Sequence, residues 1–130
     1  MKENKIQSEA KIQAESVKWF TNNFCLKHHN PKFICFSVPN EAIQKMAWQQ
    51  INTFKAMGLK SGVSDVIVLL EGKVLFVEFK AAKGAQTPKQ KSFQEDVQTL
   101  GFEYHICRSL EDFQDLVSSN VKVSALTENS

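Results

Sequence analysis

The sequence predicts an α/β fold in which a mixed central β-sheet is flanked by helices. Segments with helical periodicity alternate with short apolar runs, in the order α-β-α-β-β-α-β-α. Two of the apolar runs, at residues 65–70 and 74–79, are separated by Glu71-Gly72-Lys73, a sequence typical of a hairpin turn. The chain has 130 residues, of which 42% are hydrophobic, and this is enough for the core of one domain. We therefore expect a single domain over residues 1–130, with its core at about 8–117 and polar tails at both ends.

The first half of the chain is expected to form a helix, a strand and a second helix. Apolar residues recur at helical spacing over about 8–23, and a β-branched and aromatic run follows at 33–38. Residues 42–57 have helical composition, and Gly58 is suited to the position just after a helix. The polar segment between the first helix and the strand contains the adjacent His28-His29 pair, which we expect to be solvated rather than to bind a metal.

A third helix is predicted to begin after the hairpin, because the sequence there contains several start signals together. Thr87 can cap the helix, Pro88 suits its first position, and Gln90 completes a capping box. Gly101 is expected to end this helix.

The last two predicted elements are a strand at 102–107 and a helix reaching about residue 117. Ser109 and Asp112 have the spacing of a second capping box at the start of that helix. His105 lies inside the predicted strand, where a packed, hydrogen-bonded histidine is expected rather than a catalytic one.

The aromatic residues sit at helical or strand spacings and are interpreted first as core. This applies to Trp19, to Trp48 and to the phenylalanines. The helix at 42–57 carries more apolar residues than one core-facing stripe needs, with Met46 and Phe54 among them. Two interpretations stay open: this helix is well buried, or it offers a surface to a second subunit.

Cysteine usage and hydropathy exclude several classes of protein. The three cysteines are scattered and show no C-x-x-C spacing, so we do not expect a zinc site. We expect the cysteines to be free thiols in a reducing compartment. No apolar run is long enough to span a membrane, and the start of the sequence lacks the apolar region of a signal peptide. We expect a cytoplasmic protein without membrane contact.

The charge is unevenly distributed, although the formal net charge is only +2. Residues 55–91 contain seven lysines and three acidic residues, whereas the sequence after Lys91 is rich in acidic side chains. A basic face of this kind would suit a phosphate backbone, although lysines also commonly solvate surface turns. The lysines expected to contact nucleic acid are Lys60, Lys83, Lys89 and Lys91.

Two carboxylates and one lysine are predicted to converge at one end of the hairpin. Asp65 opens the first apolar run, while Glu78 and Lys80 end the second and share a strand face. Antiparallel pairing across the turn would bring Asp65 close to Glu78. Charges in such an apolar place are costly unless they are paired or bind a metal, and carboxylate oxygens suit Mg²⁺. A lysine beside the metal can stabilise a developing oxyanion or orient a water.

These residues, with their flanking sequence, resemble a known nuclease family. The stretch from Gly58 to Asp65, the run Phe76-Val77-Glu78-Phe79-Lys80, and then Gly84, Thr87-Pro88 and Gln90 are similar to the VRR-NUC (virus-type replication-repair nuclease) domain. This family belongs to the PD-(D/E)XK nuclease superfamily, and the resemblance covers roughly residues 8–117. Ser64 stands where the superfamily name has proline, a position that varies in these proteins. The resemblance implies a restriction-endonuclease-like core.

The resemblance also implies roles for individual residues. Asp65, Glu78 and the backbone carbonyl of Phe79 would bind Mg²⁺ or Mn²⁺, and Lys80 would position a water or neutralise the charge that develops on the phosphate.

Four further residues are assigned by the resemblance, and each has a plain alternative. Gln90 would contact the scissile phosphate or a metal-bound water, although its capping role is also sufficient. Glu9 would reach toward the metal with Gln13 as a helper, although both could lie on a solvated helix face. Asn40 matches an asparagine that follows a strand in many relatives and is assigned to nucleic-acid binding, although a turn-forming asparagine is equally consistent.

The function implied is a metal-dependent DNA endonuclease acting on branched DNA, as Holliday-junction resolvases do. Stand-alone domains of this length resemble phage or bacterial proteins, so the expected location is a bacterial cell or a phage-infected host. A homodimer is expected, because two symmetric sites can cut two strands of a branched substrate. The alternative is a nuclease fold that binds DNA or protein without cleaving it.

Overall fold

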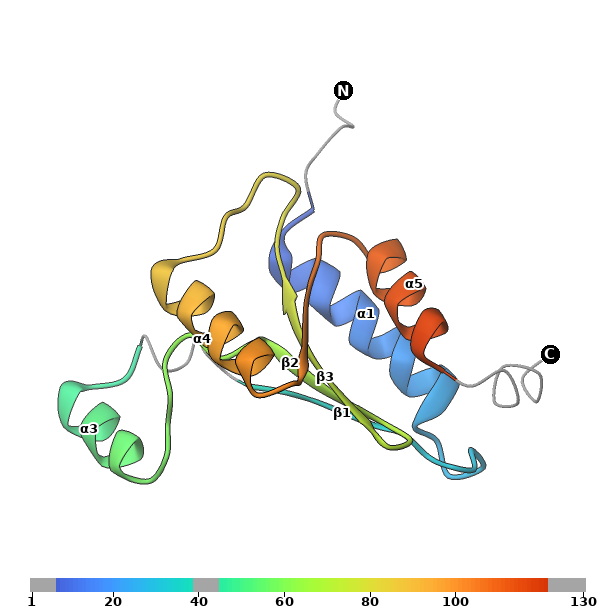
Figure 1. The fold of residues 1–130 in the computed structure, drawn as a ribbon, viewed down its shortest axis with the longest axis horizontal. Coiled ribbons are helices and arrows are strands. Elements are labelled where there is room, and N and C mark those ends of the chain that lie inside the picture. Colours follow the sequence, from blue (N-terminus) through green and yellow to red (C-terminus); the bar gives the residue numbers. More distant parts are fainter. Residues whose placement is uncertain (1–6, 39–44, 122–130) are drawn as a thin grey trace.

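The computed structural model describes residues 7–38 and 45–121, in which a four-stranded sheet lies between helices (Figure 1). The predicted role of Asn40 concerns a residue outside these ranges. The elements, in chain order, are α1 (Glu9–Phe24), β1 (Ile34–Ser37), α3 (Trp48–Ala56), β2 (Val66–Leu70), β3 (Lys73–Phe79), α4 (Pro88–Thr99), β4 (Glu103–Cys107) and α5 (Leu110–Asn120).

The sheet is mixed, as predicted, with its strands in the order β1-β2-β3-β4. The β1–β2 and β2–β3 pairs are antiparallel, whereas β3 and β4 run parallel. The β2–β3 hairpin closes through Glu71-Gly72 alone, because Lys73, predicted to lie in the turn, is the first residue of β3 and pairs with Leu70. Gly72 has a φ of 71°. Such a positive φ is easily adopted only by glycine. The register also pairs Val66 with Val77, so β3 continues past the first residue of β2.

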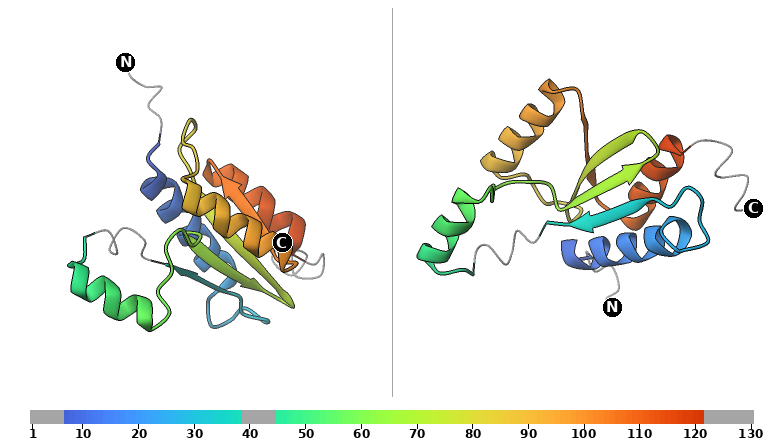
Figure 2. Two further views of the ribbon diagram at one scale, coloured as in Figure 1. Left: turned by 60° about the vertical axis from the view of Figure 1, so that its left-hand side comes forward. Right: turned by 90° about the horizontal axis from the view of Figure 1, so that it is seen from below.

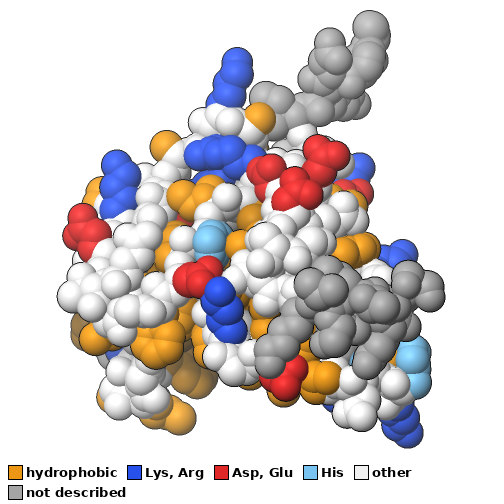
Figure 3. Space-filling model, turned by 45° about the vertical axis from the view of Figure 1, so that its right-hand side comes forward, with side chains coloured by type: hydrophobic (Ala, Val, Ile, Leu, Met, Phe, Trp, Pro, Cys, Tyr) orange, Lys and Arg blue, Asp and Glu red, His pale blue; other side chains and the backbone are white. Residues whose placement is uncertain are grey.

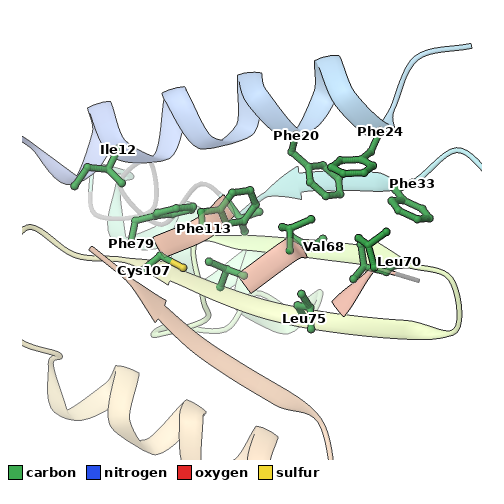
Figure 4. Packing of buried hydrophobic residues seen from close by; sticks show 14 residues of the cluster. Ile12, Phe20, Phe24, Phe33, Val68, Leu70, Leu75, Phe79, Cys107 and Phe113 are labelled. Carbon is green, nitrogen blue, oxygen red and sulfur yellow. The ribbon is translucent and has the colours of Figure 1, made fainter. Parts of the chain in front are cut away.

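One face of the sheet is covered by α1 and α5 (Figures 1 and 4). Side chains on a strand alternate between the two faces, so every second residue of β2 and β3 points to these helices. Four aromatic rings form the centre of the packing, with ring centroids 5.1 to 6.4 Å apart: Phe20, Phe24, Phe33 and Phe113. Trp19 packs edge-on against this cluster, which confirms its predicted place in the core.

The other face is covered by α4 over β3 and β4 (Figure 2). Phe76 on β3 contacts Phe93 of α4 and Phe102, and Phe93 also contacts Tyr104 on β4. Glu78 shares the face of Phe76, because the two residues are two apart on one strand. Its carboxylate therefore lies between the sheet and the start of α4.

The helix expected at 42–57 differs from the prediction in both length and packing. Within the described residues it begins at Trp48, after a turn at 45–46, and its apolar side chains do not enter the core. No residue of α3 is buried, and the helix stands apart from the sheet (Figures 1 and 2). Trp48, its first residue, and Met57, directly after its end, are each 74% exposed. The interpretation of a well-buried helix is therefore wrong, and so is the core assignment of Trp48. The core assignment is also wrong for three of the phenylalanines, which are exposed: Phe36, Phe54 and Phe102. Helical spacing shows which residues share a face, but it does not show what that face meets.

The helix ends follow the predicted capping chemistry with one difference. Thr87 and Gln90 form the capping box, with Gln90 N–H to Thr87 Oγ1 at 3.2 Å and Thr87 N–H to Gln90 Oε1 at 2.8 Å. Ser109 caps α5 by accepting the Asp112 N–H at 3.0 Å. The Asp112 carboxylate, however, accepts the N–H of Arg108 at 2.9 Å, so the second box has only one of its two expected bonds.

All three cysteines are free thiols, as expected. Burial raises the pKa of Cys35 and of Cys107 to about 12, so both are protonated at neutral pH. Among the residues described, no helix combines the length and the apolar character that a membrane crossing requires.

Candidate functional site

The structure brings Asp65, Glu78 and Lys80 together where β3 continues beyond β2. Asp65 directly precedes β2, and its Oδ2 accepts the backbone N–H of Phe79 at 2.7 Å. Glu78 and Lys80 are only 1% and 6% exposed, and Lys80 Nζ lies 3.3 Å from Glu78 Oε2. The charges that the sequence places at the ends of the two apolar runs thus converge in a nearly buried position.

Asp65 is electrostatically unfavourable in its ionised form. Burial raises the pKa of its carboxyl group, and the neighbouring charges of Glu78 and Glu9 raise it further. The Phe79 N–H and the Lys80 ammonium act in the opposite direction without cancelling the increase. A cation beside Asp65 would favour the ionised carboxylate and remove this cost.

The two oxygens of Glu78 have different surroundings. Oε1 accepts the Tyr104 hydroxyl and lies 3.3 Å from Gln86 Nε2. Oε2 is buried and accepts no hydrogen bond from the described residues, although the Lys80 ammonium is near it. Oε2 is therefore ion-paired but not hydrogen-bonded within the described part of the chain, and a cation bound there would share this oxygen with the Lys80 ammonium. Burial and the bond to Glu78 raise the pKa of Tyr104, which keeps its hydroxyl a donor at neutral pH.

The carboxylates of Asp65 and Glu78 supply only part of the ligands that a hard divalent cation needs. In the described part of the chain, no three His, Cys, Asp or Glu side chains are grouped closely enough to hold a metal ion. A cation here would have two carboxylates, from Asp65 and Glu78, and would need backbone or water oxygens in addition. Mg²⁺ commonly binds in this way, through one or two carboxylates and several waters.

Glu9 lies close to the Asp65–Glu78 site, on the face of the sheet that α1 covers. It lies in the first turn of α1, and its Oε2 is 3.2 Å from where a Cβ on Gly84 would be. A side chain at residue 84 would be in tight contact with the Glu9 carboxylate, which could move slightly because Glu9 is exposed. Gln13 lies one turn further along α1 and is half-buried, and its helper role stays a prediction.

Arg108 holds the loop that follows β3, a role that the sequence interpretation missed. One nitrogen of its guanidinium group, Nη1, donates to the carbonyls of Ala81 and Gly84, each at 2.8 Å. Parallel pairing sets Phe79 opposite Cys107, so the residues that follow the two strands are neighbours. A lone arginine directly after the last strand was the available signal, but it becomes informative only once β3 and β4 are known to be adjacent.

The predicted lysines are all exposed, and two of the segments that carry them are in contact. Gly62 has a φ of 81°, and a Cβ there would be 2.7 Å from the backbone oxygen of Lys89. The loop with Lys60 therefore packs against the first turn of α4, which carries Lys89 and Lys91. Figure 3 shows a face with a different character, where several acidic side chains gather. The first turn of α5 contains two acidic residues, Glu111 and Asp112.

Comparison with known proteins decides the family. A family model described as the VRR-NUC domain matches residues 7–111. The chain belongs to the VRR-NUC family. The match confirms the resemblance found in the sequence and places the chain among nuclease-type domains.

Solved structures of VRR-NUC proteins have the same fold. A structure described as a "VRR_NUC domain protein" aligns with a TM-score of 0.65 and 18% identity, covering 88% of each chain. A second, described as a "VRR_NUC domain", gives a TM-score of 0.57 and 18% identity, covering 85% of this chain and 94% of that one. At this identity the likeness shows the fold alone. No curated protein matches the sequence.

Proposed function

We propose that this VRR-NUC protein is a metal-dependent endonuclease that hydrolyses phosphodiester bonds in DNA. The observation that carries the proposal is a buried carboxylate, Glu78 on β3, beside a half-buried one, Asp65, just before β2. Asp65 is costly to ionise there, and Glu78 has an oxygen without a donor among the described residues. Such an arrangement lowers stability unless a cation is bound, and the fold is that of a nuclease family.

The chain supplies a consistent set of roles around this point. Asp65 and Glu78 would hold Mg²⁺ or Mn²⁺ together with the carbonyl of Phe79. That carbonyl faces the same side as the Phe79 N–H that Asp65 accepts, because both groups of one strand residue point the same way. Such an ion polarises the phosphodiester and lowers the pKa of a water. Lys80, fixed beside Glu78, would orient the attacking water or neutralise charge on the phosphate.

Gln90 and Glu9 would complete the site. The oxygen of Gln90 is engaged in the helix cap, so a contact with phosphate would come from its amide nitrogen, which is a donor and suits an anion. Glu9 would accept a hydrogen bond from a water in the site or add negative charge near the cation.

The DNA backbone would lie across the loop with Lys60, the loop with Lys83 and the start of α4. These three segments border the carboxylates, and the contact between Gly62 and Lys89 holds two of them side by side. Each lysine that neutralises a phosphate contributes roughly one unit to the slope of log affinity against log salt.

Branched DNA and a homodimer are the finer part of the proposal. One carboxylate pair cuts one strand per binding event, so a junction calls for two sites related by symmetry. Exposed apolar side chains on α3, notably Trp48 and Phe54, offer a surface that a second copy would cover. Light scattering at micromolar concentration tests this: a stable monomer that cuts linear ends as fast as four-way junctions contradicts the resolvase-like part alone.

The decisive experiment is cleavage of a panel of flap, fork, four-way junction, single-stranded and linear DNA, with Mg²⁺, with Mn²⁺ and with EDTA. We expect metal-dependent cleavage by the natural chain and none by Asp65→Asn or Glu78→Gln. Tight DNA binding without cleavage under every metal condition would instead establish a non-catalytic binding module on a nuclease fold.

A further inference from the structure

The carboxylate of Glu78 accepts hydrogen bonds at one oxygen and is ion-paired with Lys80 at the other. Oε1 receives two donors, the Tyr104 hydroxyl and the Gln86 amide, while Oε2 faces Lys80. Both oxygens belong to a side chain that is 1% exposed. The asymmetry therefore comes from neighbouring side chains and not from solvent.

Tyr104 reaches Glu78 because of the parallel pairing of β3 and β4. The register sets Tyr104 opposite Phe76 and Ile106 opposite Glu78, so Tyr104 lies diagonal to Glu78 on the same face. Diagonal neighbours on a sheet are within reach of a long aromatic side chain. The Tyr104 ring packs against Phe93 of α4, with centroids 6.1 Å apart, and its hydroxyl donates to Glu78 Oε1.

Gln86 is itself fixed from α4. Its Nε2 lies 3.0 Å from Gln94 Oε1 and 3.5 Å from the Tyr104 hydroxyl, in addition to its contact with Glu78. A connected set of neutral donors and acceptors thus surrounds one oxygen of a buried carboxylate. Such networks are stronger than isolated bonds because each partner restricts the others.

We infer that Tyr104 and Gln86 are positioning residues, which hold Glu78 by Oε1 so that Oε2 is directed at the cation site. The inference rests on the proposed function, since it concerns the metal ligand of that site. Neither residue would touch the cation or the DNA. Their effect passes through the orientation of Glu78, because a carboxylate free to rotate would pay the ordering cost each time a cation binds.

The test is Mn²⁺ binding to the full chain without DNA, measured by isothermal titration calorimetry. Tyr104→Phe keeps the ring that packs against Phe93 and removes only the hydroxyl. We expect Mn²⁺ affinity to fall by roughly 10- to 100-fold, the usual effect of losing a partner behind a metal ligand. Gln86→Leu should also weaken Mn²⁺ binding, because it removes the second donor to the same oxygen of Glu78.

A kinetic readout separates positioning from general damage to the structure. If Tyr104 and Gln86 act through Glu78, the Mn²⁺ concentration for half-maximal cleavage should rise in both variants in step with the loss of Mn²⁺ affinity. The cleavage rate at saturating Mn²⁺ should stay within a few-fold of that of the natural chain. Ser119→Ala is the matched control, since it removes a hydroxyl that bonds the Leu116 carbonyl on α5, away from the site. It should leave affinity and rate unchanged.

Several outcomes would overturn the inference. One such outcome is that Mn²⁺ affinity is unchanged in both Tyr104→Phe and Gln86→Leu but is lost in Glu78→Gln. This would rule out the positioning role and leave the nuclease proposal standing. Absence of Mn²⁺ binding by the natural chain would remove both. If circular dichroism shows that Tyr104→Phe does not fold, Gln86→Leu decides alone.

Discussion

Replacing Asp65 by asparagine or by alanine should change stability in opposite directions when no metal is present. The asparagine removes the charge that burial, Glu78 and Glu9 make unfavourable, but it keeps an oxygen to accept the Phe79 N–H. The alanine removes the charge and the acceptor together. Because Phe79 is fully buried, its N–H would then have no partner.

The magnitude follows from that lost hydrogen bond. An unsatisfied buried N–H costs about 1–3 kcal/mol, so Asp65→Ala should be less stable than Asp65→Asn by this amount. For a chain of this size each kcal/mol changes Tm by roughly 4 °C, which gives a difference of about 4–12 °C. Asp65→Asn itself should melt at or above the temperature of the natural chain.

Thermal unfolding in EDTA, followed by circular dichroism across a pH series, measures both effects. The pKa of Asp65 is raised above its ordinary 3.8 in the folded state, so the folded chain binds more protons just above that pH. Below the pKa of Asp65 in the unfolded chain, the natural chain and Asp65→Asn should therefore be equally stable. As pH rises from that pKa through the higher pKa of the folded chain, the natural chain should become the less stable of the two. Added Mg²⁺ should raise the Tm of the natural chain only. An asparagine variant that loses as much stability as the alanine variant in EDTA would refute the electrostatic reasoning.

Three further predictions concern other residues. Lys80→Met, which keeps the buried stem, should lower the cleavage rate at saturating metal far more than it lowers Mn²⁺ affinity; calorimetry showing lost Mn²⁺ binding with normal cleavage would reverse this role. Removing the charges of Lys60 and Lys89 together should flatten the log–log salt dependence of DNA binding by roughly two units, measured by fluorescence anisotropy, and an unchanged slope would remove them from the interface. Ser16→Ala should raise the free energy of unfolding, measured in urea melts, by about 1 kcal/mol. The buried Oγ of Ser16 has no hydrogen-bond partner among the described residues, and alanine favours the helix. A loss of stability would reveal a partner for this hydroxyl.

The hairpin and its charged end could be predicted from the sequence because the signals there are local. A two-residue turn sets the register, and the register alone brings Asp65 to the end of β3. The capping box at Thr87 is local in the same sense, and it appears with both expected bonds.

The partners of Glu78 could not be predicted in the same way. Tyr104 lies 26 residues later, and only the parallel pairing of β3 with β4 brings it to the carboxylate. Arg108 depends on the same pairing. The exposure of Trp48 was missed for a related reason, since amphipathic spacing is equally compatible with a buried face and with a face left open.

The charge balance of the site gives a physical reason why it should hold a divalent ion rather than act as a structural ion-pair cluster. The charges that act on one another around Asp65 are three carboxylates, from Asp65, Glu78 and Glu9, and one ammonium, from Lys80. Fully ionised, the two carboxylates that are shielded from solvent leave one negative charge uncompensated beside Lys80, and the exposed Glu9 adds a second. The groups that hold the carboxylates in place are neutral: the Phe79 N–H on Asp65, and the Tyr104 hydroxyl and Gln86 amide on Glu78. A cluster built for stability would supply another cation, because buried charge without a partner costs several kcal/mol. Neutral donors instead fix the geometry and leave the charge deficit intact, which a single divalent cation would balance.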